Sequence, residues 1–322
     1  MIIVGNGLGM ALDPYFFNLG NAIREVWTDF LSQSPEQKML IASCFETCND
    51  LPKSEQELEK LNNVDLSCRA LKCIKQNSLS LLSEEGEAFP DIAQNFRTAV
   101  AWHFHKYKGE FPDEFIDPLT NHIINRKSHI VTLNYDNLLY QKLIQRKILN
   151  GYSGQLVDGF WNSCGFNEEH LTRKGNNCFG YYLHLHGSPL FIDSGGKIIK
   201  QSQCNASPIP TPHLVLTHPD GKEHMIENSP VLKTYWRLLK PANQESNITI
   251  LFGYSGLDNH LNCAIKLSSQ KRKIFIVEWE GAGHKDDRMK FWQQNLAQGE
   301  DQGNIELIRM KNILDFQNWD DI

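Results

Sequence analysis

Three polar side chains that directly follow apolar segments are the best candidates for chemistry. Asn134 and Asp136 come after Ile130-Val131-Thr132, and His186 comes after Tyr181-Tyr182-Leu183-His184-Leu185. Alone, an Asn-x-Asp segment is as compatible with a turn, but in open α/β sheets ligands bind beyond the carboxyl ends of the strands. There an imidazole can accept a proton near neutral pH from a water or hydroxyl that an amide orients. The residue types therefore indicate removal of a proton from a bound water or hydroxyl.

Two glycine turns follow further apolar runs. Gly5-Asn6-Gly7-Leu8-Gly9 comes after Ile2-Ile3-Val4, and Gly253-Tyr254-Ser255 comes after a run that begins at Ile248, with Asp258 close behind. Glycine lacks the Cβ that would bar a pyrophosphate from the backbone, although an ordinary tight turn uses the same residues. The spacing differs from the G-x-G-x-x-G of standard dinucleotide-binding folds. For the first turn, its position directly after a strand favours phosphate binding over a plain turn.

A carboxylate ends another predicted strand. Lys273-Ile274-Phe275-Ile276-Val277-Glu278 places Glu278 where it is able to accept ribose hydroxyls. A solvated glutamate at a strand end is an equally good interpretation.

The order Gly-x-Gly, Thr-x-Asn-x-Asp, His-Gly and Gly-x-Ser resembles that of sirtuins, especially the sirtuin-like domains of bacterial anti-phage defence proteins. The resemblance covers most of the chain outside an N-terminal helical stretch. It implies that Asn134 positions the acceptor near the anomeric carbon of the nicotinamide ribose, that Asp136 holds the carboxamide, and that His186 is the general base. Nicotinamide departs through an oxocarbenium-like state, as in other glycosidic cleavages.

The resemblance also implies a binding site for NAD⁺ as substrate. Asp13-Pro14-Tyr15-Phe16 is the local match to the loop that covers the nicotinamide end in sirtuins. After Ser255, Gly-Leu-Asp replaces the usual sirtuin residues, which is typical of the defence branch. The residues expected to contact NAD⁺ besides Asn134 and His186 are Gly5, Asn6, Gly7, Leu8, Asp13, Thr132, Asp136, Gly187, Gly253, Tyr254, Ser255, Asp258 and Glu278.

The cysteines do not form a convincing metal site. The 8 cysteines are expected to be reduced thiols, and the C-x3-C and C-x4-C pairs at 44, 48, 68 and 73 suit helix neighbours better than a zinc knuckle. Sirtuin deacylases carry a four-cysteine zinc ribbon after the catalytic histidine. Here only Cys204 and Cys263 follow His186, so that ribbon cannot form, and a deacylase is disfavoured.

An H-x-H pair is the remaining metal candidate. His184 and His186 alternate on one strand and would share a face, as in some zinc sites. His213 and His218 are available as third ligands, but no spacing singles either out. We therefore expect no metal, and we interpret His184 as a structural neighbour of the base.

Composition and chain length narrow the classes of protein to which the chain could belong. With 322 residues, a net charge of −6 and a pI near 6.1, the chain shows no basic excess, so direct nucleic-acid binding is not expected. Gly5 comes too soon after Met1 for a signal peptide to precede the first strand, and no apolar run is long enough to cross a bilayer. A cytoplasmic protein without membrane contact is expected.

The elements that must position these residues follow from spacing and caps. An N-terminal helical insertion is predicted over 20–127, with stripes such as Ile92, Phe96, Val100 and Phe104. Alternating strands and helices then predict one α/β domain over 1–322, with a Rossmann-like, mostly parallel, doubly wound sheet. The predicted helices include 138–148 and 231–239, and the predicted strands are 2–5, 129–133, 181–186, 213–217, 248–253, 273–278 and 304–309.

The resemblance implies an NAD⁺ glycohydrolase that makes nicotinamide and ADP-ribose as an effector of anti-phage abortive infection. The alternatives are a non-catalytic sensor of NAD⁺ or ADP-ribose, and a sirtuin-type deacylase or ADP-ribosyltransferase. Control is expected through homo-oligomer assembly, with the helical insertion as interface, or through a regulatory or sensor partner such as an ATPase or nucleotide-processing subunit.

Overall fold

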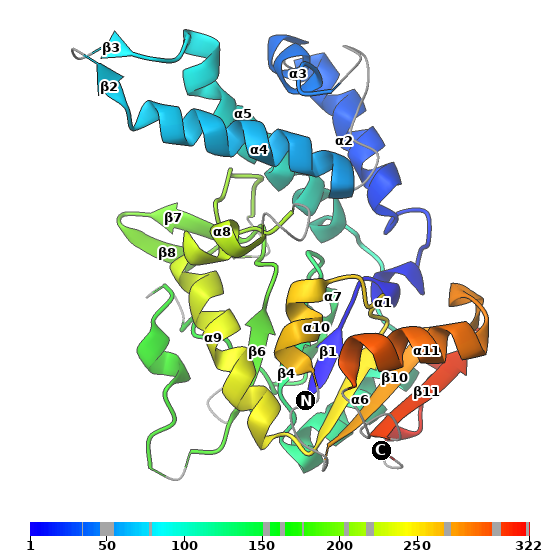
Figure 1. Ribbon diagram of the computed structural model, residues 1–322. Helices are drawn as coiled ribbons and strands as arrows, with labels where there is room; N and C mark the ends of the chain where they lie inside the picture. Colours follow the sequence, from blue (N-terminus) through cyan, green and yellow to red (C-terminus); the bar gives the residue numbers. More distant parts are fainter. Residues whose placement is uncertain are drawn as a thin grey trace.

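The computed structural model describes residues 1–33, 35–45, 55–76, 79–150, 155–161, 165–175, 177–202, 206–216, 222–266, 272–297, 304–319 and 322. Within this part of the chain, a seven-stranded parallel sheet lies at the centre and helices cover both of its faces (Figure 1). The predicted Rossmann-like, doubly wound α/β fold is therefore confirmed.

The strand order of the sheet is β11-β10-β9-β1-β4-β6-β5. From β1 the chain builds outward to β4 and β6 on one side, and later returns to build β9, β10 and β11 on the other. The direction of winding therefore changes between β1 and β9, which is where ligands bind in such sheets. The strands are β1 (Ile2–Val4), β4 (Ile130–Thr132), β5 (Leu156–Val157), β6 (Gly180–His184), β9 (Ile248–Phe252), β10 (Lys273–Trp279) and β11 (Ile305–Met310).

Alternation of apolar residues explains why both faces of the sheet are covered. Ile2 and Phe252 belong to the hydrophobic cluster on one face, whereas Ile3, Val131 and Leu251 belong to the cluster on the other. Successive side chains of a strand point to opposite faces, so a strand that is apolar throughout is buried on both sides.

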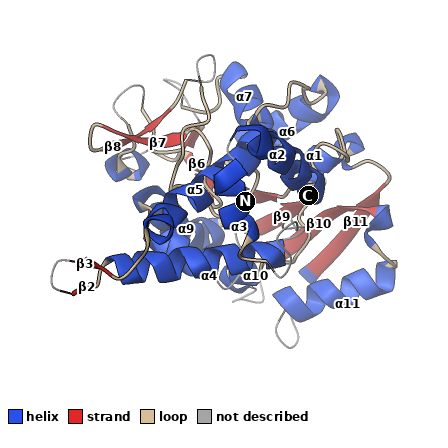
Figure 2. Cartoon of the chain, turned by 90° about the horizontal axis from the view of Figure 1, so that it is seen from above, coloured by secondary structure: helices blue, strands red, loops and turns tan. Residues whose placement is uncertain are grey.

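Helices on the two faces complete these clusters. α6 (Asp113–Arg126) and α7 (Leu138–Gln145) pack on one face, and α9 (Pro230–Glu245), α10 (Asn259–Ile265) and α11 (Lys285–Leu296) pack on the other. Figure 2 shows α11 on one side of the strands and α6 and α7 on the opposite side. Short elements fill the connections: α1 (Gly7–Met10), α8 (Lys222–Glu227), the hairpin of β7 (Phe191–Ser194) and β8 (Lys197–Lys200), and 3₁₀ helices at Glu168–Leu171, Glu280–Ala282 and Ile313–Asp315.

A layer of helices lies over the carboxyl ends of the strands (Figure 1). It contains α2 (Leu19–Gln33), α3 (Pro35–Ala42), α4 (Glu55–Lys72), a hairpin of β2 (Lys75–Gln76) and β3 (Leu79–Ser80), and α5 (Glu84–His105). Trp27 packs edge-on against Phe96, and Arg97 forms a buried ion pair with Asp65, which ties α2 and α4 to α5. None of the helices described is long and apolar enough to cross a membrane.

The strand predicted at 213–217 is wrong. Leu214 makes only an isolated antiparallel bridge to Gly187, and Val215 donates its amide proton to the carbonyl of His186 at 3.0 Å. Residue 217 lies outside the described part. The run 213–216 is buried, so its apolar composition reflects burial of an extended segment rather than membership of the sheet. The sheet instead gains the short edge strand β5, which was not predicted.

Candidate active site

A cavity of about 950 Å³ opens at the carboxyl ends of the strands. Its wall runs along the sheet edge from His186 beyond β6, through Asn134 beyond β4, to Glu278 on β10. Neighbouring strands lie about 4.8 Å apart, so this wall extends roughly 19 Å across β6, β4, β1, β9 and β10. Phe17 and Phe104 close it from the side of the helical layer. The cavity is therefore elongated and suits an extended ligand.

Asn134 lies on the cavity wall and carries a buried acceptor without a hydrogen bond. The residue is 7% exposed, its backbone amide donates to Thr132 Oγ1 at 3.1 Å, and its side-chain amide donates to Asp136. The side-chain oxygen Oδ1 is buried and has no hydrogen-bond partner. Buried polar atoms are nearly always hydrogen-bonded, so such an exception at a cavity wall indicates a ligand or water.

Asp136 lies beside Asn134 on the cavity wall. Burial raises the pKa of its carboxyl to about 6, against the lowering effect of hydrogen bonds from the amides of Leu138 and Asp136 and from the Asn134 side chain. At neutral pH Asp136 is therefore ionised and can only accept hydrogen bonds.

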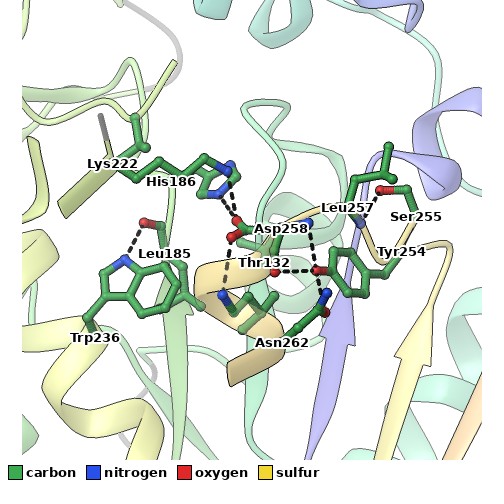
Figure 3. A network of polar contacts seen from close by, with 12 residues as sticks. Thr132, Leu185, His186, Lys222, Trp236, Tyr254, Ser255, Leu257, Asp258 and Asn262 are labelled. Carbon is green, nitrogen blue, oxygen red and sulfur yellow. Dashed lines mark hydrogen bonds and ion pairs between the residues drawn. The ribbon is translucent and has the colours of Figure 1, made fainter. Parts of the chain in front are cut away.

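His186 is hydrogen-bonded to a carboxylate that a lysine also contacts (Figure 3). His186 Nε2 lies 3.1 Å from Asp258 Oδ2, and Lys222 Nζ lies 2.8 Å from the same oxygen. The other oxygen, Oδ1, accepts from the Leu261 amide at 3.1 Å and caps α10. Three donors from three elements thus hold Asp258 in place.

The charges of these groups fix the tautomer of His186. Burial alone would raise the pKa of Asp258, but the hydrogen bond from His186 and the charge and hydrogen bond of Lys222 hold it well below its usual range. Because Asp258 is ionised, His186 Nε2 carries the proton of their hydrogen bond. Nδ1 is then the ring nitrogen able to accept a proton.

A tight turn positions His186. Leu185 donates its amide proton to Thr132 O on the neighbouring strand, and Gly187 donates to His184 O, each at 3.0 Å. Gly187 has φ of +77°, and a Cβ at this position would lie 1.8 Å from His213 O. Gly187 is not on the cavity wall, so close backbone packing explains this glycine.

The glycines of the first turn lie on the wall, but packing between two turns also requires them. A Cβ on Gly5 or Gly7 would lie 2.7 or 2.5 Å from Gly253 O. Gly5 donates its amide proton to Phe252 O, Gly7 to Gly253 O and Leu8 to Gly5 O, at 3.0, 2.8 and 3.1 Å. These three amides are bonded within the protein, so their geometry supplies no free donors for a phosphate.

Glu278 lies at the far end of the cavity. Its Oε2 accepts from Arg288 Nε at 3.0 Å, from a terminal Arg288 nitrogen at 2.7 Å and from Trp292 Nε1 at 3.2 Å. Its Oε1 is buried without a hydrogen-bond partner, and Arg309 Nε lies 3.5 Å away. Glu278, which is 3% exposed and lines the cavity, therefore has one carboxylate oxygen that accepts no hydrogen bond and is paired only with the charge of Arg309.

The predicted site residues divide into two groups. Those on the cavity wall are Gly5, Asn6, Gly7, Asn134, Asp136, His186, Gly253, Tyr254, Ser255, Asp258 and Glu278. The structure places Leu8, Asp13, Thr132 and Gly187 elsewhere: Leu8 is in the core, Asp13 Oδ1 caps its own loop through the amides of Tyr15 and Phe16, and Thr132 supports Asn134. These four residues therefore lie off the cavity wall and support its lining residues.

Some wall residues also have structural tasks. The Asn6 side chain donates to Phe17 O at 2.8 Å and so holds the loop that carries Phe17. The Tyr254 hydroxyl donates to Asn262 Oδ1 at 2.9 Å and accepts from the Asp258 amide at 3.2 Å, which fixes the turn leading to Asp258. Ser255 Oγ accepts from the Leu257 amide at 3.3 Å.

Several wall residues were missed in the sequence, and Lys222 is the most informative. A buried lysine looks like any surface lysine in a sequence, and its partner Asp258 lies 36 positions away. The cations Arg288 and Lys311 and the rings of Phe17, Phe104, Tyr135 and Trp279 were missed as well.

His184 is separate from this site. It is 4% exposed, lies against the rings of Tyr182 and Tyr140, and has neither ring nitrogen hydrogen-bonded. Burial lowers the pKa of His184 to about 3, so the ring is neutral. His213 bonds Ser229 and Asp193, and among the described residues no group of three or more His, Cys, Asp or Glu side chains is arranged to hold a metal. His218, Cys48 and Cys204 lie outside the described residues.

Comparison of the chain with protein-family models and with curated proteins finds no match. The chemistry of the site is therefore inferred from its own residues.

Proposed function

We propose that the protein is an NAD⁺ glycohydrolase, which cleaves the bond between nicotinamide and ribose with water and yields nicotinamide and ADP-ribose. The observation that supports this most is the buried, unpaired Oδ1 of Asn134 on the wall of the cavity that also holds His186. Leaving a buried acceptor without a partner costs about 1–3 kcal/mol, so a bound donor such as water fits this position.

The residues at this end of the cavity suit the proposed reaction. Asn134 Oδ1 accepts a hydrogen bond from the attacking water and orients it, and His186 Nδ1 takes its proton. Asp258 holds the imidazole through Nε2. Ionised Asp136 accepts from the carboxamide of nicotinamide. A general base typically accelerates a reaction by about 10²–10⁴-fold, and correct orientation of the water adds to this acceleration.

The opposite end of the cavity suits the adenosine half of the substrate. Glu278 Oε1 is a buried acceptor without a hydrogen bond and would take a ribose hydroxyl. Asn134 follows β4 and Glu278 lies on β10, three strand positions away and so roughly 14 Å along the edge. Arg288, which is bonded to Glu278, and Lys311, which follows β11, offer positive charge for phosphate groups at this end of the cavity. The positions of these groups along the sheet edge thus support one orientation of NAD⁺, with nicotinamide beside Asn134 and adenosine beside Glu278.

A cytoplasmic enzyme that depletes NAD⁺ must be restrained, and we propose control by assembly with a second copy of this chain, as in anti-phage effectors. The layer of α2 to α5 supports this, because it exposes large apolar side chains: Met39 is 64% exposed, Ile74 53% and Leu81 48%. A sensor partner such as an ATPase or nucleotide-processing subunit is the second proposed trigger.

The proposal predicts that purified protein incubated with NAD⁺ alone releases nicotinamide and ADP-ribose in equal amounts, with a specific rate that rises with protein concentration. Chromatography of both products checks this, with light scattering on the same samples. Nicotinamide released only when an acyl-lysine peptide is added would identify a deacylase. Binding of NAD⁺ by calorimetry without release of nicotinamide at any concentration would contradict the proposal and identify a sensor.

A further inference from the structure

Lys222 has no role in the reaction described so far, yet its position is unusual for a lysine. It is the first residue of α8, its side chain is 3% exposed, and its ammonium lies at the cavity wall. Burying an ammonium group is costly unless it is paired. Its partner is Asp258 Oδ2, the same oxygen to which His186 is bonded.

Groups from three elements lie beside the His186 ring. Asp258 at the start of α10 is bonded to Nε2, Lys222 of α8 shares that carboxylate oxygen, and the ring of Tyr135 beyond β4 lies 6.3 Å away between centroids. Tyr135 is uncharged and donates its hydroxyl to Val215 O. On the Nε2 side of the ring, a carboxylate and an ammonium are therefore bonded to each other and carry opposite charges.

We propose that Lys222 is a positioning residue that keeps His186 neutral, and so able to accept a proton, by cancelling the charge of Asp258. The proposal rests on the role of His186 as general base in NAD⁺ cleavage. A lone carboxylate within 4–6 Å typically raises the pKa of a histidine by about 1–3 units because it stabilises the imidazolium. At neutral pH such a histidine would be protonated and unable to act as a base. Lys222 offsets this effect on the shared oxygen, while Asp258 still orients the ring.

Substitution of Lys222 and substitution of Asp258 should shift the pKa of His186 in opposite directions. Lys222→Met leaves the Asp258 charge uncompensated, so the pKa of His186 rises and the acidic limb of kcat/KM for NAD⁺ moves up by about one pH unit. On that limb the rate falls about tenfold. Asp258→Asn leaves only the ammonium beside the ring, so the limb moves to lower pH. The double variant carries neither charge, and its limb should lie near that of the parent.

Two further variants separate charge from packing. Lys222→Arg keeps the cation and should restore the parental pH profile. Lys233→Met is the matched control, since Lys233 lies on the neighbouring α9, pairs with Glu227 at 2.5 Å and is 59% exposed. Its removal should leave the profile unchanged. A purely structural role of Lys222 would lower the rate equally at every pH without moving the limb.

A second measurement needs no NAD⁺. NMR titration of the His186 ring, assigned with His186→Gln, should show the same order of pKa values: Lys222→Met above the parent and Asp258→Asn below it. Should Lys222→Met fail to fold, the comparison of Asp258→Asn with the double variant still isolates the lysine, whose loss should raise the pKa of His186. Unchanged pKa values in these comparisons would overturn the proposal, whether or not the protein cleaves NAD⁺. Shifted values without any NAD⁺ cleavage would support the role of Lys222 and count against the proposed reaction alone.

Discussion

His186→Ala and Asn134→Ala should each slow NAD⁺ cleavage by at least about a hundredfold, a typical loss for a general base or an orienting group. His186→Ala removes the proton acceptor, and Asn134→Ala removes the buried oxygen Oδ1 that has no partner in the protein. Initial rates of nicotinamide release at saturating NAD⁺ measure both effects. Since the two groups act on one water, the double variant should be scarcely slower than the poorer single variant.

The fold should survive both substitutions. When the His186 ring is lost, Asp258 still pairs with Lys222 and still accepts the Leu261 amide, so no uncompensated charge is left buried. His184→Ala is the control, and it should affect stability rather than activity. Its ring packs among Tyr140, Tyr182 and Phe191, so the variant should lose thermal stability while the folded protein keeps its chemistry. Parental rates in folded His186→Ala and Asn134→Ala protein would show that the site is assigned wrongly.

Gly187→Ala should have the largest effect on stability, lowering the free energy of unfolding by more than about 3 kcal/mol, at the upper end for single substitutions. A Cβ at this position would lie 1.8 Å from the carbonyl oxygen of His213, which is backbone and cannot move aside like a side-chain tip. The substitution would also displace His186, the preceding residue, so the folded fraction should lose activity. Denaturant unfolding followed by circular dichroism measures the stability change.

Gly195→Ala separates this clash from the cost of a positive φ. Gly195 has φ of +58° in the turn between β7 and β8, and a Cβ there would meet nothing within 4 Å. Its substitution should cost only about 1–2 kcal/mol, the typical penalty of a left-handed conformation. Equal losses in the Gly187 and Gly195 variants would mean that the contact with His213 is relieved cheaply and does not fix the turn.

The sheet was predictable because its central strands are apolar on both faces and end in glycine or polar residues. Each of the strands built around Ile3, Val131, Leu183, Leu251 and Ile276 was found at the predicted place to within a few residues. The segment 213–216 was not, because a buried extended segment beside a sheet has the same composition as a strand. Edge strand β5, with two residues, is too short to produce a periodic pattern.

The site was predictable in outline for the same topological reason. Carboxyl ends of parallel strands share one edge, so Asn134, His186 and Glu278 line one cavity even though no local pattern links them. Two features escaped prediction because they depend on contacts between distant residues. Lys222 is recognisable only once it is seen buried against Asp258, and Gly187 is required by a carbonyl that follows it by many residues.

The position of a bound substrate tests the account most directly. A crystal structure of His186→Ala protein with NAD⁺ should show the nicotinamide ribose beside Asn134, with a water on Asn134 Oδ1, and the adenosine ribose on Glu278 Oε1. The pyrophosphate should cross the sheet edge between them. NAD⁺ bound outside this cavity, or in the reverse direction with adenine at the His186 end, would contradict it.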